Sequence, residues 1–424
     1  MTHTEAQPFT LRSVLTGPAL LRLGIGWGAF AALLALGPAL HAPVPAPLLI
    51  VALLGIVAVI LYCAFGVVHE AEHLARKLGD PYGSLVLTLS IVIIEVVLIA
   101  AVMLGPGEHA TIARDSVMAV SMIILNLMIG LCLLLGGLRN GGMRANRTGV
   151  SAYLGMLVVL LALAFGLPSV LGGGQFGAGQ QIAIIALTVA LYAFFLFRQM
   201  GSQAGDFVEV GQGADGADGG AAAAASLATS VVAGADADND DGSAGARSAS
   251  GSNSATPTGA GAGAATMRDV FAEHGREIAT RFVLLIATVM PIVLLSHDMA
   301  ALLDDGLARL GAPTALAGLL IAMIVFLPES ITAVRAALGG QIQRVVNLNH
   351  GALVSTVGLT IPAVLVIGLF TGQSVVLAES PVNLLLLGAS LLLSVNTYLA
   401  PKVTAMHGAA HLVLFAAYTI TIFA

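Results

Sequence analysis

The chain is a succession of apolar segments separated by short polar breaks, and each segment is about as long as a membrane-crossing helix. A helix of about 20 apolar residues spans the hydrocarbon core of a bilayer. Eleven segments meet this requirement, which predicts an all-α polytopic membrane protein. The predicted spans are residues 18–40, 46–68, 83–104, 115–138, 151–171, 181–198, 281–303, 314–335, 350–371, 381–399 and 405–423.

Composition supports the same class, because 58% of the residues are hydrophobic and only 9% are charged. Cys63 and Cys132 both lie within apolar spans, so no disulfide framework is implied. The N-terminus lacks the basic region and short apolar core of a cleaved signal peptide. Residues 1–17 are therefore expected to form a cytoplasmic tail, followed by an uncleaved first helix.

The distribution of positive charge predicts the orientation in the membrane. With the N-terminus placed in the cytoplasm, all of the 17 Lys and Arg residues except Arg114 and Arg309 fall on the cytoplasmic side. This bias is the one that membrane insertion favours. We therefore expect a multi-pass inner-membrane protein with its C-terminus outside the cytoplasm.

Two regions of the chain are similar when they are offset by 234 residues. Leu85 then aligns with Leu319 and Glu95 with Glu329, and the sequence LARKLGDP (74–81) that precedes the first region resembles LARLGAP (307–313). This similarity predicts an internal duplication, with one glutamate near the middle of a span in each copy.

The duplication divides the chain into one extra N-terminal helix, at 18–40, and two five-helix repeats, at 46–198 and 281–423. An odd number of spans in each repeat turns the second repeat upside down, as in many secondary transporters. Between the repeats, residues 201–266 are rich in Gly, Ala, Ser and Asp, and we expect a disordered cytoplasmic linker there.

Glu95 and Glu329 are the strongest candidates for chemistry. A carboxylate at bilayer depth costs several kcal/mol unless it has a partner or faces a polar cavity, so such a residue indicates function. Two carboxylates neutralise a calcium ion, and protons compete with the metal for the same oxygens. Pro328 disrupts its helix just before Glu329 and frees carbonyl groups as further ligands. We predict that both glutamates bind cations and protons in turn.

Several hydroxyl and amide groups in the same or neighbouring spans are candidate auxiliary ligands. For each hydroxyl the alternative is a hydrogen bond to the backbone of its own helix. The candidates are Thr88, Ser121, Asn126, Ser330, Ser355, Thr356 and Thr360.

The sequence HEAEH at 69–73 matches a zinc-binding motif, in which two histidines one helical turn apart bind the metal and a glutamate acts as general base. This motif defines the alternative function, an intramembrane zinc metalloprotease. No third-ligand motif accompanies it, and it leaves the paired glutamates unexplained. The other interpretation is a titratable cytoplasmic vestibule or a solvated turn, with further polar residues lining an entrance. The vestibule candidates are His69, Glu70, Glu72, His73, Asp115 and His350.

Four sequences resemble bacterial ChaA-type calcium/cation:proton antiporters of the cation/calcium exchanger superfamily. They are residues 69–99, residues 111–137, FLPES at 326–330 and NLNHGALVSTVGLTIPAVLVIG at 347–368. The resemblance implies paired intramembrane acidic residues, which correspond here to Glu95 and Glu329. The vacuolar relatives place each acidic residue in a G-N-x-x-E motif, which this chain lacks.

The sequence thus predicts a secondary antiporter, and not an enzyme, that exports calcium, and also sodium or potassium, in exchange for protons. We expect no cofactor, only the transported calcium ion and protons. The chain has no phosphate-binding glycine loop, so we expect a transport reaction driven by a gradient and not by ATP. The expected partners are inorganic cations and the lipid bilayer, without nucleic acid.

Overall fold

The computed structural model describes residues 14–37, 44–78, 110–171, 173–209, 267–313 and 315–423, together with Val92, Val96, Ile99, Ala100 and Met103. Gly211–Asp269 form a unit of their own, of which only the last three residues are described. All the following statements concern the other unit, which contains the apolar spans.

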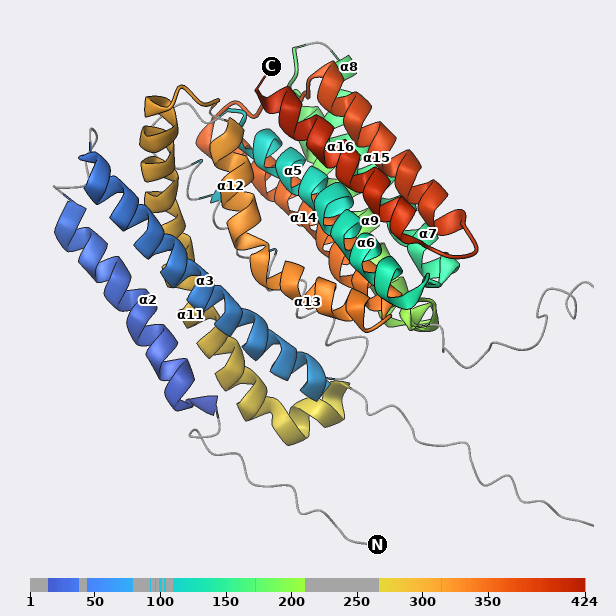
Figure 1. The fold of residues 1–424 in the computed structure, drawn as a ribbon, viewed down its shortest axis with the longest axis horizontal. Coiled ribbons are helices and arrows are strands. Elements are labelled where there is room, and N and C mark those ends of the chain that lie inside the picture. Colours follow the sequence, from blue (N-terminus) through green and yellow to red (C-terminus); the bar gives the residue numbers. More distant parts are fainter. Residues whose placement is uncertain are drawn as a thin grey trace, which may run out of the picture. The chain divides into compact units, whose positions relative to one another are not determined.

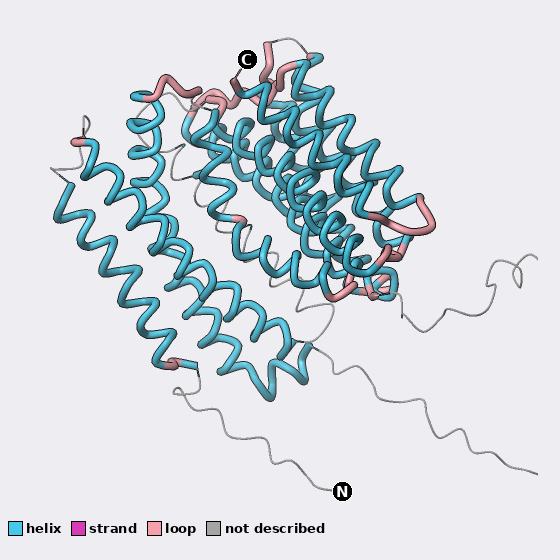
Figure 2. The backbone as a smooth tube through the Cα atoms, viewed as in Figure 1, coloured by secondary structure: helices cyan, strands magenta, loops and turns pink. Residues whose placement is uncertain are grey.

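The described part of this unit is helical throughout, apart from short loops and one isolated backbone bridge between Met143 and Val403 (Figure 2). Its α-helices are α2 (Gly17–Leu36), α3 (Ala46–Leu78), α5 (Ile112–Met122), α6 (Ile129–Asn140), α7 (Arg147–Leu161), α8 (Leu167–Val170), α9 (Ala178–Met200), α11 (Met267–Arg309), α12 (Ala315–Val325), α13 (Leu327–Leu338), α14 (Ile342–Thr371), α15 (Pro381–Leu399) and α16 (Ala405–Ile422). Two π-helical turns, η2 (Ile123–Met128) and η3 (Ala162–Gly166), and one 3₁₀ turn, η4 (Ala204–Phe207), complete the elements.

The predicted spans agree well with these helices. Within the described residues, nine helices are long and apolar enough to cross a membrane, and the bent pair α12–α13 brings the number to ten. Each of them corresponds to one predicted span. The remaining predicted span, 83–104, falls almost entirely outside the described residues, so the total of eleven and the inverted repeat stay predictions.

Three boundaries differ from the sequence prediction. Helix α11 begins at Met267 and contains 43 residues, so it extends well beyond the predicted span of 281–303. Helix α14 begins at Ile342 and not at residue 350, because polar residues continue the helix before its apolar part. Residues 201–209, which were assigned to the disordered linker, form the η4 turn and a short segment after it.

That short segment is ordered because it binds the first turn of α14. The carboxylate of Glu209 accepts hydrogen bonds from the backbone N–H groups of Gln343 (3.1 Å) and Arg344 (3.3 Å). The side chain of Asn347 donates to the carbonyl of Phe207 at 2.7 Å. A helix begins with unpaired N–H groups that favour an acceptor. Burial raises the pKa of Glu209, and the hydrogen bonds from the backbone oppose this shift.

The buried apolar side chains form two main clusters. The larger joins α5, α6, α7, α9, α12, α13, α14, α15 and α16, and the smaller joins α3 and α11, with residues of α2 and α12 packed against it. Figure 1 shows α2, α3 and α11 side by side, with α12 and α13 between them and the remaining helices. Helix α13 contacts both α3 and α14, so the broken span borders both clusters.

Glycines allow α6 and α16 to approach closely. A Cβ atom at Gly408 would overlap the backbone of Leu134, and one at Gly130 would lie 2.9 Å from the side chain of Leu412. Gly137 lies equally close to the backbone of Ala405. Small residues at helix crossings are a common means of association in membranes, where burial of apolar surface provides little driving force. The α6–α16 pair therefore forms the tightest crossing of the larger cluster.

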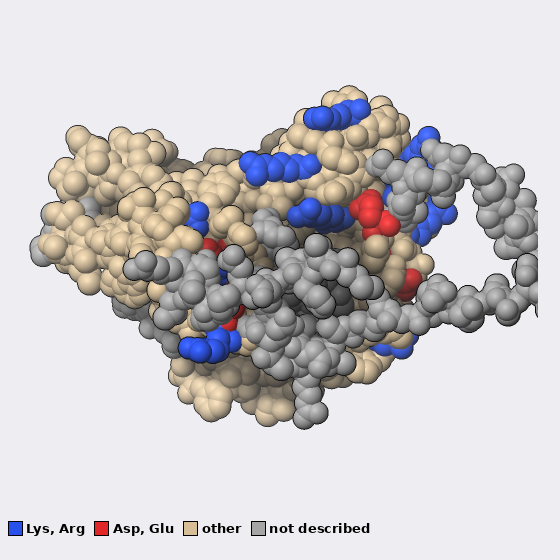
Figure 3. All heavy atoms as spheres, turned by 90° about the horizontal axis from the view of Figure 1, so that it is seen from below, with Lys and Arg blue, Asp and Glu red and all other residues tan. Residues whose placement is uncertain are grey.

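Positive charge gathers at one end of the helices. Apart from Arg114 and Arg309, the described Lys and Arg residues lie toward the end at which α6, α9 and α13 terminate. Figure 3 views the molecule from this side and shows blue side chains spread over it. The separation agrees with the topology that the charge pattern predicts. Which end faces the cytoplasm remains a prediction.

We expect Gly408→Val to lower the stability of the folded protein. The added side chain meets the backbone of Leu134, and overpacking of this kind costs about 1–3 kcal/mol. Thermal unfolding in detergent measures the effect. Gly388→Val on α15 is the matched control, since no atom lies within 4 Å of a Cβ at that position. Equal unfolding temperatures for the two variants would contradict the close crossing.

Candidate cation site

The span that contains Glu329 is broken. Helices α12 and α13 meet at an angle of 56°. Pro328 is the second residue of α13, where a helix tolerates a missing N–H group. Because Pro328 cannot donate to the carbonyl of Ile324, one backbone oxygen near the bend lacks its usual helical partner. A break of this kind within an apolar span provides polar groups at membrane depth.

Glu329 lies in the first turn of α13, directly after the bend. Its Oε2 atom is buried and has no hydrogen-bond partner among the described residues. A buried carboxylate oxygen without a partner is costly, and a bound proton or cation removes that cost. Helix α13 begins at this point, so the carboxylate also lies near the positive end of a helix dipole.

A π-helical turn lies beside this segment. The Oγ atom of Ser330 donates to the carbonyl of Phe326 at 2.6 Å and lies 3.0 Å from the Sδ atom of Met128 in η2. π-turns within α-helices occur frequently at functional sites because they displace side chains from their regular positions. The contact connects the residue next to Glu329 with the helix formed by α5, η2 and α6.

Asn126, on the same π turn, is bound on the side of α15 and α16. Its Nδ2 atom donates to the Oγ atom of Ser390 at 2.7 Å, and Ser390 in turn donates to the carbonyl of Leu386. The Oδ1 atom of Asn126 lies 3.4 Å from Nδ1 of His411, whose Nε2 lies 3.4 Å from Thr397. Asn126 therefore participates in a buried network that fixes η2 against two neighbouring helices.

Helix α14, which packs against α13, contributes the remaining candidates. Tyr192 on α9 shares a hydrogen bond of 2.9 Å with Ser355. Thr356 is fully buried. The Oγ1 atom of Thr360 is buried and, like Oε2 of Glu329, has no hydrogen-bond partner within the described residues. Among the described auxiliary candidates, Thr360 is thus the one whose buried hydroxyl has no hydrogen-bond partner and could bind a cation.

The backbone alternative holds for two of the predicted hydroxyl ligands. Ser121 donates to the carbonyl of Val117 at 2.7 Å, and Ser330 donates to Phe326 in the same way. Each hydroxyl oxygen retains lone pairs, but its orientation is set by its own helix. Thr88 and Glu95 lie outside the described residues, as does the side chain of Glu72.

The HEAEH sequence lies near the end of α3. Its first glutamate, Glu70, is held there by an ion pair. The Oε2 atom of Glu70 lies 2.8 Å from Nη1 of Arg281, and Arg281 also binds Glu277 at 3.1 Å. Both Glu70 and Arg281 are buried. A carboxylate held by a guanidinium is a poor general base, and the described residues contain no group of three His, Cys, Asp or Glu that could hold a metal. For Glu70 the expectation of an open vestibule was wrong.

One other vestibule residue, His350, occupies surroundings that differ from those predicted. His350 lies two turns inside α14 and is fully buried between the rings of Tyr153 and Tyr398, so it does not line an entrance. The prediction failed because α14 begins eight residues earlier than expected. Asp115 is partly exposed and pairs with Arg114 at 2.8 Å, at the end of the bundle opposite to α3's HEAEH sequence.

Sequence reasoning missed two residues of these networks. His411 was not among the candidates, yet it is fully buried and its Nδ1 atom lies 3.4 Å from Oδ1 of Asn126. Glu379 was not singled out, because an acidic residue in a short loop between apolar spans is usually solvated. It is 7% exposed. The one signal in the sequence was that Asn126 and His411 are polar residues within apolar spans, where each needs a polar partner from another helix.

A broken span with a carboxylate oxygen buried among membrane-crossing helices is typical of a polytopic membrane transporter. The family model described as "Sodium/calcium exchanger protein" matches residues 48–201 and 280–424. The chain belongs to this family. Its members are secondary transporters and not enzymes, and the antiporter class expected from the sequence is confirmed at this level.

Individual relatives agree with this assignment. The chain is 30% identical over 386 residues to the sodium-potassium/proton antiporter ChaA of Escherichia coli (strain K12), covering 90% of each protein. The solved structure of native YfkE superposes with a TM-score of 0.59 at 15% identity, covering 95% of this chain and 99% of that chain. The H+/Ca2+ exchanger CAX gives a TM-score of 0.56 at 15% identity, covering 96% and 89%. These two similarities establish the fold.

We expect Arg281→Met to destabilise the contact between α3 and α11. The substitution leaves Glu70 buried without its partner, which costs about 3–5 kcal/mol. Thermal unfolding of purified protein measures the loss. The double variant Glu70→Met/Arg281→Met should recover most of the stability, because two apolar side chains replace the pair. A double variant as unstable as the single one would contradict a buried ion pair.

Proposed function

We propose that the protein is an inner-membrane antiporter that exports calcium, and also sodium or potassium, in exchange for protons. The unpartnered, buried Oε2 atom of Glu329 is the observation on which this proposal rests. It lies in a broken span of a chain that belongs to an exchanger family. A group that needs either a proton or a cation at membrane depth suits the alternate binding of the two.

Glu95 is the second carboxylate of the proposed site. It occupies the position that aligns with Glu329 when the two halves are offset by 234 residues. In an inverted repeat, equivalent residues of the two halves meet near the midplane of the membrane. Thr360 is the auxiliary ligand that we propose, because its unpartnered hydroxyl lies on α14, one of the helices that pack against α13.

The choice of cation follows from charge and from the relatives. Two carboxylates balance a divalent ion, and calcium prefers hard oxygen ligands of the kinds present here. The Escherichia coli relative is a sodium-potassium/proton antiporter, which supports sodium and potassium as further substrates. The chain lacks the G-N-x-x-E motif of the vacuolar relatives, so their auxiliary ligands and ion selectivity do not carry over to it.

Cation-stimulated proton movement in everted membrane vesicles tests the proposal. A pH-sensitive dye reports protons that leave the vesicle interior when calcium, sodium, potassium or magnesium is added outside. We expect a response to calcium and to at least one monovalent cation. A lack of response to all four cations, in vesicles that contain the protein, would refute the antiporter.

We expect Glu329→Gln and Glu95→Gln each to abolish exchange without loss of protein from the membrane. A single carboxylate cannot neutralise a divalent ion, and glutamine does not bind the proton in return. Glu277→Gln is the matched control, because Glu277 pairs with Arg281 in the first part of α11 and does not belong to the proposed site. Exchange at the wild-type rate in either site variant would exclude the two-glutamate site.

Transport should weaken as the cytoplasmic pH falls. Protons and cations compete for the same carboxylate oxygens, so acidification raises the apparent KM for the cation before it lowers the maximum rate. Full competition by one or two protons changes KM by about ten- to a hundredfold per pH unit. Initial rates at several cation concentrations and pH values measure this slope. A KM independent of pH would place the proton site elsewhere.

A further inference from the structure

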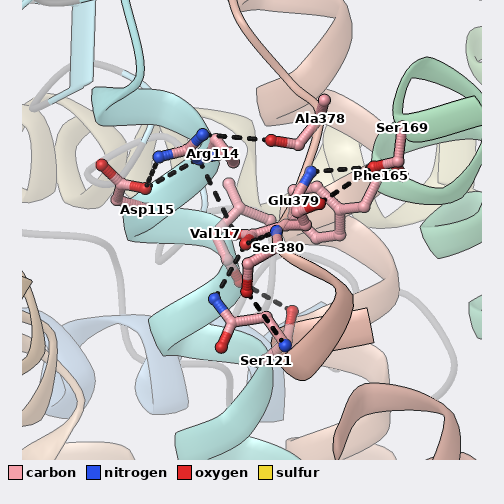
Figure 4. Close-up of polar contacts among 10 residues, drawn as sticks. Arg114, Asp115, Val117, Ser121, Phe165, Ser169, Ala378, Glu379 and Ser380 are labelled. Carbon is pink, nitrogen blue, oxygen red and sulfur yellow. Dashed lines mark hydrogen bonds and ion pairs between the residues drawn. The ribbon is translucent and has the colours of Figure 1, made fainter. Parts of the chain in front are cut away.

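A cluster of polar side chains joins the start of α5 to the loop between α14 and α15 (Figure 4). The guanidinium of Arg114 donates to the carbonyl of Ala378 at 3.0 Å and lies 2.8 Å from Oδ1 of Asp115. The loop is also held by its backbone, since the N–H of Val376 donates to the carbonyl of Ala110 at 2.8 Å. The cluster is therefore fixed to the helix that leads to η2.

Glu379 points into this cluster with one of its two oxygens unsatisfied. The Oε2 atom accepts hydrogen bonds from the N–H of Ser380 (3.1 Å) and from Asn383 (2.8 Å). The Oε1 atom is buried and has no hydrogen-bond partner among the described residues. Its closest ion-pair contact is Nε of Arg114 at 3.9 Å, and the side chain is 3% exposed.

Arg114 is only partly available to neutralise Glu379. Its guanidinium makes close contacts to Asp115, whose side chain is 43% exposed, and reaches Glu379 only at the longer distance. Burial raises the pKa of Glu379, and the charge of Asp115 raises it further. The hydrogen bonds from Asn383 and Ser380 and the charge of Arg114 lower this pKa, but the net shift is upward. Tyr418 of α16 also lies within electrostatic reach of Glu379 and Asp115.

We propose that Glu379 is a second proton-binding site, which takes up protons at the outer end of the bundle during exchange. This inference rests on the proposed function and on the predicted orientation, in which the start of α5 faces outward. A metal ion fits the cluster less well. The guanidinium of Arg114 would repel a cation at this point, and within the described residues no group of three ligands could hold a metal.

The fold gives this site a connection to the cation site. Helix α5 begins at the cluster and continues into η2, where Met128 contacts Ser330, the neighbour of Glu329. Asp115 and Met128 are separated along this helix by about 20 Å. One continuous helix therefore joins the proposed proton site at Glu379 to the residues around Glu329.

The first test is the dependence of cation efflux on external pH, in right-side-out vesicles loaded with calcium or potassium at a fixed internal pH. Glu379→Gln keeps the shape and the hydrogen bonds of the side chain but cannot bind a proton. We expect its rate to equal that of the wild type at acidic external pH and to fall several-fold below it at alkaline pH, where protons are scarce. An unchanged pH profile, or an equal loss at every pH, would overturn the proposal.

Asp305→Asn is the matched control for surface charge. Asp305 lies on α11 toward the same end of the bundle and pairs with Arg309 at 2.6 Å, so its loss removes a carboxylate that already has a partner. We expect this variant to retain the wild-type pH profile. A profile altered in the same way as that of Glu379→Gln would show that net charge at this end, and not a specific proton site, controls the rate.

The two neighbours of Glu379 should shift the profile in opposite directions. Arg114→Gln removes a nearby positive charge, which raises the proton affinity of Glu379 and moves the midpoint to higher external pH. Asp115→Asn removes a negative charge and frees Arg114 to pair with Glu379, which lowers the midpoint. A shift of about one pH unit corresponds to a tenfold change in proton affinity. Shifts in the same direction would refute this arrangement.

A spectroscopic measurement tests the site without transport. Infrared difference spectra of the purified full chain between alkaline and acidic pH should contain the C=O band of a buried protonated carboxyl group. Because protonated Glu329 and Glu95 contribute bands of their own, Glu379→Gln should lose one component of this signal, which Glu329→Gln should keep. A spectrum unaffected by Glu379→Gln would refute the proton site, even if the wild type shows no exchange and the proposed function itself fails.

Discussion

In the hydrocarbon region of a membrane, a polar group can be satisfied only by another group of the same protein. The described part of this chain follows the rule closely. Asn126 binds Ser390 and lies beside His411, and Glu70 binds Arg281. These contacts link helices that are distant in sequence, so the requirement for partners determines which helices lie together. The exceptions, such as Glu329 and Thr360, stand out because most polar groups nearby are paired.

The π turn η2 has a central place in this arrangement. On one side Asn126 is bound by α15 and α16, and on the other side Met128 contacts Ser330 beside the helix break. Close packing at Gly130 and Gly408 keeps α16 against the regular helix that follows the turn. The bend before Glu329 is thus set against a rigid support, whereas α3 and α11 belong to a separate apolar cluster. Such a division permits relative movement without disruption of either core.

The spans were predictable because membrane insertion depends on apolar length, which is a local property of the sequence. The predicted span 381–399 coincides with α15. The ends of α11 and α14 were not predictable in the same way, because polar residues extend both helices beyond the apolar part. Residues 201–209 have the composition of a linker, and their order depends on the distant N–H groups of α14.

Glu329 could be identified from the sequence because a carboxylate in an apolar span is rare. The buried state of Glu70, His350 and Glu379 could not, since each depends on a partner or a ring from another helix. Their sequence neighbours resemble those of ordinary interfacial residues. Tertiary contacts alone distinguish a solvated group from a buried one.

The attachment of Glu209 to α14 has a consequence for the way in which the two halves of the chain are joined. The first half ends with a segment that caps a helix of the second half, so the halves are held together by hydrogen bonds as well as by the covalent linker. A chain interrupted within residues 211–266 would keep this noncovalent attachment together with the contacts of α9 to α14. The two halves are therefore suited to assembly from separate polypeptides, as in transporters built from two subunits.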